Sequence, residues 1–380
     1  MKRIYLDNAA TTPLSSKVLA AMNKTLQEVY GNPSSIHADG RKARATIENA
    51  RKIVANAIGA SIGEVFFTSC GTESNNMILK GAVQDLGVER IISSPLEHHC
   101  VLNSLDSISK RWGTEIVFLE PDAYGRLAIE DLESLLKNKD KKTLVSLMHS
   151  NNEIGTMIDL EVIGKLCKEN NALFHTDTVQ TIGYFPIDVE KMNINFLSGS
   201  AHKFYGPKGT GFVYINGDNI LSPFIDGGSQ ERNMRAGTEN IAGIVGLATA
   251  LEEALTEMES RKDYISELRT YFKSELENNF EDIIFNGDEN GPFHYKVLSV
   301  SFPPSPKNEL LLFNLDIGGI SASGGSACSS GVDIGSHVLS AINADPERAT
   351  IRFSFSHHNT KEELDQVVEQ LKKIISPVAV

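Results

Sequence analysis

The stretch ALFHTDTVQTIGYFPIDVEKMNINFLSGSAHKFYGPKGTGFVYI, residues 172–215, contains three short β-rich runs and the polar residues most suggestive of chemistry. The runs are ALFHTD at 172, INFLS at 194 and GFVYI at 211, and four similar runs precede them: VFFT at 65, RIISS at 90, EIVFL at 115 and TLVSLM at 143. Amphipathic segments separate the seven runs, and this alternation is typical of βαβ units. We therefore predict an α/β fold with a mainly parallel seven-stranded sheet flanked by helices.

The length of 380 residues exceeds the roughly 100 to 200 residues of a usual single domain, so we expect two domains. A helical apolar pattern from Ile241 to Met258 runs into the charged stretch EMESRKD, where we expect the change of domain. Residues 15–257 would form the large domain. Residues 1–14 and 258–380 would form a smaller α+β domain with strands near KVLSVSF and TIRFSF and a terminal helix.

The composition excludes several classes of protein. A formal charge of -13 argues against nonspecific binding to nucleic acid. No apolar stretch resembles a signal peptide or a membrane span, which predicts a cytoplasmic location. Four cysteines without a CxxC pair, and HH pairs without the spacing of HExxH, suggest neither a disulfide framework nor a metal site.

Lys203 lies between an apolar run and a turn rich in glycine, in SGSAHKFYGPKG. A lysine at a strand end, partly removed from water, has the lowered pKa that amine catalysis needs. Ser200 and His202 flank it as possible phosphate donors. A lone loop lysine is usually just solvated, so the interpretation depends on the neighbouring segments.

Asp177 directly follows an apolar strand, where open α/β sheets bring residues into a ligand crevice. A carboxylate there could pair with a protonated ring nitrogen of a cofactor, and Gln180 would lie close enough to bind a ring hydroxyl. The ordinary alternative is a helix cap or a turn residue.

The segment FFTSCGTESNN predicts an anion site. Gly71 and Thr72 follow a strand and precede an apolar helical pattern, so main-chain N–H groups and the positive end of the helix would face a phosphate. A simple capping box is the alternative.

Cys328 lies in SASGGSACSSG, where glycine and serine favour neither a helix nor a packed core. We expect the loop at about 323–335 to be mobile. A buried, inert cysteine is the usual alternative, and we assign that role to Cys70, Cys100 and Cys167.

Together these segments resemble the cysteine desulfurases of the NifS/IscS-like group, which are fold-type I, class V aminotransferase-like pyridoxal-phosphate enzymes. The resemblance covers nearly the whole chain, in the family's order, through YLDNAATTP, NPSSIH, FTSCGTESNN, LEHHCVL, HSNNEIGT, HTDTVQ, SAHKFYGPKG, ERNMRAGTEN, SGGSACSSG and IRFSF. Cys70 departs from it, since many relatives have glycine there, and could be a neutral variant or an extra reactive thiol.

The resemblance implies that Lys203 holds pyridoxal 5'-phosphate covalently, Asp177 binds its ring nitrogen, Gln180 its ring oxygen, and His98 stacks on the ring and takes part in proton transfer. Further implied contacts are Gly71, Thr72, Ser200 and His202 to the phosphate, Thr238 to the phosphate of the partner subunit in a homodimer, and Asn152, Arg352 and Asn8 to the substrate, with Asn152 also beside the cofactor.

The implied reaction converts L-cysteine to L-alanine, with Lys203 as the base and Cys328 taking the sulfur as a persulfide. An acceptor protein, such as an iron–sulfur scaffold or a thiolating protein, would then receive it. Selenocysteine lyase or another cysteine/cystine lyase on the same fold is the alternative. Two further alternatives have less support. One is a non-catalytic scaffold on the same fold. The other is an acyl-transfer site of S-x-x-K type at Ser200 and Lys203, but the SDN and KTG elements of such a site are missing from the sequence.

Overall fold

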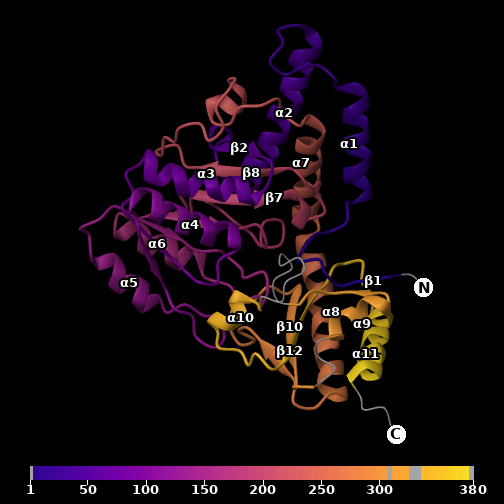
Figure 1. Cartoon of the computed structure of the whole chain (residues 1–380). Helices are drawn as coiled ribbons and strands as arrows, with labels where there is room; N and C mark the ends of the chain where they lie inside the picture. The colour runs from indigo at the N-terminus through magenta and orange to yellow at the C-terminus, as the bar shows by residue number, and fades with distance from the viewer. Residues whose placement is uncertain (1–2, 306–309, 325–334, 376–380) are drawn as a thin grey trace.

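The structure is a computed structural model that describes residues 3–305, 310–324 and 335–375. Its largest feature is a seven-stranded sheet with the strand order β2-β8-β7-β6-β5-β3-β4 (Figure 1). The strands are β2 (Val65–Thr68), β3 (Arg90–Ser93), β4 (Glu115–Phe118), β5 (Thr143–Ser146), β6 (Leu173–Asp177), β7 (Phe196–Ser200) and β8 (Gly211–Ile215). β8 is antiparallel to both of its neighbours, and the other neighbouring pairs are parallel. The predicted α/β fold is confirmed.

The strands are apolar on both faces because helices cover both faces of the sheet. Successive side chains point to opposite sides, so Ile91 and Leu144 pack in one cluster while their neighbours Ile92 and Val145 pack in another. The first cluster contains side chains of α3 (Gly71–Gln84) and α4 (His99–Trp112). The second contains side chains of α1 (Ser16–Glu28), α2 (Ala38–Ala57), α5 (Ile129–Lys137), α6 (Leu160–Glu169) and α7 (Ile241–Thr256).

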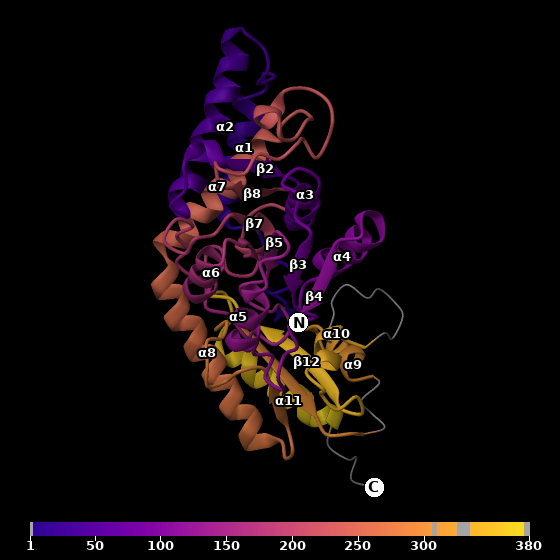
Figure 2. The same cartoon turned by 90° about the vertical axis from the view of Figure 1, so that its left-hand side faces the viewer.

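A second, antiparallel sheet has the order β12-β10-β9. Its strands are β9 (Ile284–Asn286), β10 (Val297–Phe302) and β12 (Ala349–Ser354). The long helix α8 (Met258–Asn279) contacts β10 and also α11 (Lys361–Ile375), as Figure 2 shows along one side of the molecule. The expected strands near KVLSVSF and TIRFSF and the terminal helix are therefore present.

The N-terminal segment packs against these C-terminal elements. β1 (Ile4–Tyr5) pairs in parallel with β11 (Ile320–Ser321), and Asp7 forms a bridge with Ser354 of β12. The short helices α9 (Leu311–Ile317) and α10 (His337–Ala341) complete this region. The helical pattern that begins at Ile241 breaks at Glu257, between α7 and α8. The division into domains at 14/15 and 257/258 stays a prediction.

Within the residues that the structure describes, no helix combines the length and the apolar character needed to cross a membrane.

Candidate active site

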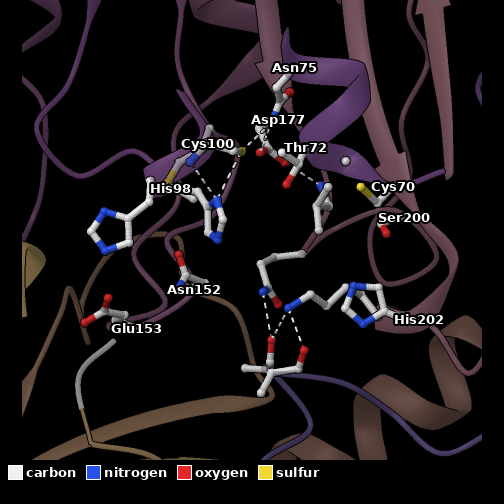
Figure 3. Close-up of a pocket in the computed structure, with 18 of the residues that line it drawn as sticks. Cys70, Thr72, Asn75, His98, Cys100, Asn152, Glu153, Asp177, Ser200 and His202 are labelled. Atoms are coloured by element: carbon white, nitrogen blue, oxygen red, sulfur yellow. Dashed lines mark hydrogen bonds between the residues drawn. The ribbon is translucent and has the colours of Figure 1, made fainter. Parts of the chain in front are cut away.

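A cavity of about 290 Å³ lies at the carboxyl ends of the strands of the large sheet (Figure 3). β2, β3, β5, β6 and β7 all point in one direction, so the residues that follow them meet at one edge. Open α/β sheets bind ligands at this edge. β12 of the second sheet closes the cavity from the other side with Arg352.

Ten residues predicted from the sequence line this one cavity, although they are spread over nearly 300 positions of the chain. They are Gly71, Thr72, His98, Asn152, Asp177, Gln180, Ser200, His202, Lys203 and Arg352. Two other predicted residues lie elsewhere. Asn8 is buried beside the cavity and donates to the Ser354 carbonyl at 2.8 Å, while Thr238 is exposed. Cys328 lies outside the described residues.

Lys203 ends the short helix η2 (Ala201–Lys203), which follows β7 directly. Its Nζ donates to the carbonyls of Ala9 and Ala10 at 2.7 and 2.9 Å. Tyr184 donates its hydroxyl to the Lys203 carbonyl at 2.8 Å and so fixes the main chain of the lysine. The amine is thus positioned inside the cavity by two neutral main-chain acceptors, whose contacts a covalent bond could replace.

Asp177 is the last residue of β6 and is buried. Its Oδ1 accepts the Val179 N–H at 2.9 Å, and its Oδ2 accepts an N–H of Asn75 at 2.7 Å. Donors from two neighbouring residues therefore hold both oxygens of the carboxyl group. Gln180, one turn further on, donates to the Ala9 carbonyl at 3.0 Å, while its Oε1 has no partner.

The first turn of α3 provides an anion site. Cys70 is the N-cap residue, and its side chain makes no capping hydrogen bond, so the first N–H groups of the helix are left for another acceptor. Gly71 is required here because a Cβ would lie 2.5 Å from Cγ2 of Val179. Ser200 faces the same corner with a buried hydroxyl that has no partner (Figure 3).

Both histidines of the predicted site are held neutral near pH 7. Burial lowers the pKa of His202 to about 4, and the charge of Lys203 adds to the effect. Burial also lowers the pKa of His98, opposed by Asp177 and aided by Lys203. A buried imidazole of this kind binds through a hydrogen bond or a ring face rather than through charge.

Arg352 is buried at the opposite wall. Its Nη2 pairs with Asp7 at 2.8 Å, and its Nη1 donates to the Asn152 carbonyl at 2.9 Å. Its Nε has no partner. A guanidinium held in this way still has the Nε–H available for an anionic substrate group.

The structure also brings residues to the cavity that the sequence analysis missed. Cys100, assigned there to an inert buried role, contacts His98, and Asn75 contacts Asp177. The remaining ones are Ala9, Ala10, Met148, Glu153, Val179, His99 and His337. The only feature of the sequence that could have pointed to Asn75 as a site residue is its position one turn after Thr72 in α3.

The family follows from comparison with known proteins. The model of the aminotransferase class-V family matches residues 4–367. The chain therefore belongs to the aminotransferase class-V family.

Individual relatives match along their whole length. The chain is 46% identical to cysteine desulfurase IscS of Dictyoglomus turgidum, covering 99% of this chain and 95% of that protein. It is 40% identical to putative cysteine desulfurase IscS 1 of Bacillus subtilis, covering 99% of both. A solved NifS-like protein superposes with a TM-score of 0.90 at 37% identity, covering 98% of this chain and 99% of that one.

Proposed function

We propose that this protein is a pyridoxal-phosphate-dependent cysteine desulfurase, which converts L-cysteine to L-alanine and carries the sulfur on Cys328. The observation that carries the proposal is the convergence of Lys203, Asp177 and the first turn of α3 on one cavity. The names and the coverage of the relatives support the same activity.

The cavity suits pyridoxal phosphate group by group. Lys203 would hold the aldehyde carbon, Asp177 the ring nitrogen and Gln180 the ring oxygen, while His98 would cover the ring. The phosphate would lie at the first turn of α3 with Ser200 and His202. The unpartnered Ser200 Oγ and Gln180 Oε1, both buried, support this fit because an orphaned buried polar atom is costly without a ligand.

When bound, the cofactor would supply an electron sink for the carbanion at Cα. The protein's own groups would do the remaining work. Arg352, with Asn152, would orient the substrate carboxylate. Lys203 Nζ would take the proton from Cα, and the neutral imidazole of His98 would assist proton transfer.

Cys328 would then attack the sulfur of the substrate, so that the C–S bond breaks and a persulfide remains on Cys328. Alanine leaves after the carbon skeleton is protonated. An acceptor protein, such as an iron–sulfur scaffold, would take up the persulfide sulfur.

A homodimer is part of the proposal because Thr238 would serve the partner's site. The loop that carries Thr238 lies against α3, since Arg235 pairs with Glu73 at 2.8 Å. Thr238 itself is exposed, as a residue that contacts a partner subunit would be in a single chain.

The activity can be tested by supplying L-cysteine with a reductant and measuring alanine and sulfide. We expect both products in equal amounts, and their loss with Cys328→Ser. If Cys328→Ser still releases both, the lyase alternative replaces the desulfurase. L-selenocysteine supplied to the same variant distinguishes selenocysteine lyase, which would retain its activity.

A further inference from the structure

A chain of hydrogen bonds runs beneath the cavity and ends at His98. We call it the floor network and define it by six residues: Ser146, His175, Asn75, Asp177, Cys100 and His98. They lie on the neighbouring strands β5 and β6 and on the helices α3 and α4, with His98 at the N-cap of α4. All of the contacts between them lie within 3.3 Å. The positions of the hydrogen atoms in this network follow from its chemistry.

The side-chain amide of Asn75 decides which groups in the network donate hydrogen bonds and which accept them. Its Nδ2 lies 2.7 Å from Oδ2 of Asp177 and 3.3 Å from Sγ of Cys100. A carboxylate oxygen needs a donor, so the amide nitrogen must face Asp177. The amide oxygen therefore faces Nε2 of His175, at 3.2 Å.

His175 is consistent with that direction. The residue is fully buried, and burial lowers its pKa to about 3, so the ring is neutral. Its Nε2 must carry the proton in order to donate to Asn75, and its Nδ1 then accepts the hydroxyl of Ser146 at 2.9 Å. Each donor in this part of the network has an acceptor.

The thiol of Cys100 accepts a hydrogen bond from Asn75 and donates one to His98. Burial raises the pKa of the thiol to about 12, and hydrogen bonds from Asn75 and Thr72 oppose the shift only in part, so the S–H stays protonated. The sulfur accepts from Asn75, which leaves the S–H hydrogen for Nδ1 of His98 at 3.1 Å. The main-chain N–H of Cys100 also points to this Nδ1, at 3.2 Å.

Two donors on Nδ1 decide the tautomer of His98. A main-chain N–H can only donate, so Nδ1 cannot carry a proton while this contact exists. The proton of the neutral ring is then on Nε2, and Figure 3 shows this second ring nitrogen facing the cavity. The charged groups that act on His98 are Asp177, which favours protonation, and Lys203, His99 and His337, which oppose it.

We propose that Asn75 and Cys100 are positioning residues that hold His98 as the neutral Nε2–H tautomer and present that N–H to the cavity. The tautomer follows from the hydrogen-bond geometry around Nδ1 together with the burial that keeps the ring neutral. Its consequence for the rate rests on the proposed desulfurase function, because there His98 would begin the reaction as a donor and not as a base.

The first test reads the tautomer directly. In the full-length protein labelled with ¹⁵N-histidine, long-range ¹H–¹⁵N correlation spectra at neutral pH distinguish Nδ1–H from Nε2–H, and His98→Gln assigns the signal. We expect an unprotonated Nδ1. A proton on Nδ1 would overturn the proposal. The spectrum needs no turnover, so its result is separate from success or failure of the desulfurase assay.

The second test removes the thiol. Cys100→Ala deletes one donor to Nδ1, and we expect the pKa of His98, followed in the same spectra, to rise by about half to one pH unit. Cys100→Ser keeps a donor and should restore the original value. Cys167→Ala deletes a buried thiol of α6 with no contact to the network and is the matched control.

An unchanged pKa in Cys100→Ala, or an equal rise in Cys167→Ala, would contradict the role of Cys100. Thermal melting of the three variants identifies any that is misfolded, and the tautomer of the unmodified protein decides the proposal in that case. In an active enzyme the pH profile of kcat/KM should shift in Cys100→Ala and return in Cys100→Ser, a response that loss of packing alone would not give.

Discussion

Asp177 is held at the end of β6 by hydrogen bonds from Asn75 and Val179. Its place after an apolar strand marks the ligand edge of the sheet, and the structure puts it in the cavity. Its partner Asn75 could not be predicted, because the contact depends on α3 lying beside β6, two elements separated by about 100 positions. The contact between Asn75 and Cys100 could not be predicted either, because it depends on the packing of α3 against α4.

The charge of Asp177 is expected to matter more than its shape. Asp177→Asn keeps the volume but places an NH₂ against donors from Asn75 and Val179, and it removes the negative charge near the ring nitrogen. We expect kcat to fall by about 10² to 10³, measured as alanine release. Asp263→Asn, an exposed change on α8, is the control and should retain full activity. Similar activities in both variants would remove Asp177 from the proposed site.

At the scale of elements, the apolar runs predicted each strand of the large sheet because both faces of the sheet are covered. The order of the strands was not predictable. GFVYI has the same apolar character as the other runs, but it forms β8, which is antiparallel to β2 and β7. Its direction follows from a tight return after η2, a feature of packing rather than of composition.

A buried ion pair ties the loop of Thr238 to the large sheet. Glu231 in η3 (Gln230–Asn233) binds Arg51 of α2 at 2.6 and 3.0 Å and accepts the Phe67 N–H at 2.7 Å. Both charged side chains are 3% exposed. Removing the charge of Glu231 leaves the buried Arg51 with only the partly exposed carboxylate of Glu48, at 3.1 Å, as an ionic partner.

Glu231→Gln should therefore lower the free energy of unfolding by about 3 to 5 kcal/mol, measured by urea denaturation. Glu259→Gln affects an exposed pair on α8, 3.9 Å from Lys262, and should change stability by less than about 0.5 kcal/mol. An equally small effect in Glu231→Gln would mean that the pair does not anchor the loop.

At the scale of the whole molecule, the acidic composition and the length predicted an ordinary globular chain, and the family followed from motifs spread over most of it. We expected residues 1–14 to belong with the C-terminal part of the chain, but two features remained beyond the sequence. One is the pairing of the N-terminal segment with β11 and β12 that brings Ala9 to Lys203. The other is the neutral state of the buried histidines. Both depend on contacts between distant segments.

Buried histidines make the stability depend on pH. Burial lowers the pKa of His149 to about 4, so between the ordinary value of 6.5 and about 4 the unfolded chain binds more protons than the folded one. Stability should fall as the pH drops through this window, by on the order of 3 kcal/mol for this residue. Urea denaturation of His149→Gln should show a correspondingly weaker pH dependence. An identical pH dependence in both proteins would contradict a neutral, buried His149.

The proposed dimer can be tested with two defective subunits. Lys203→Ala would remove the amine, and Thr238→Asp would put a negative charge against the phosphate of the partner's site. If Thr238 acts across the interface, a heterodimer of the two variants has one intact site. Co-purified heterodimers should then regain up to about half of the unmodified activity. No recovery beyond that of either variant alone would place Thr238 in its own subunit's site or in none.

The central claim is that sulfur leaves L-cysteine for Cys328. Its most direct test is to incubate the protein with L-cysteine in the absence of a reductant and to measure the mass of the peptide that carries Cys328. We predict a gain of one sulfur atom on that peptide, absent from the peptides of Cys70, Cys100 and Cys167, together with release of alanine. Continued release of alanine while the Cys328 peptide keeps its original mass would contradict it.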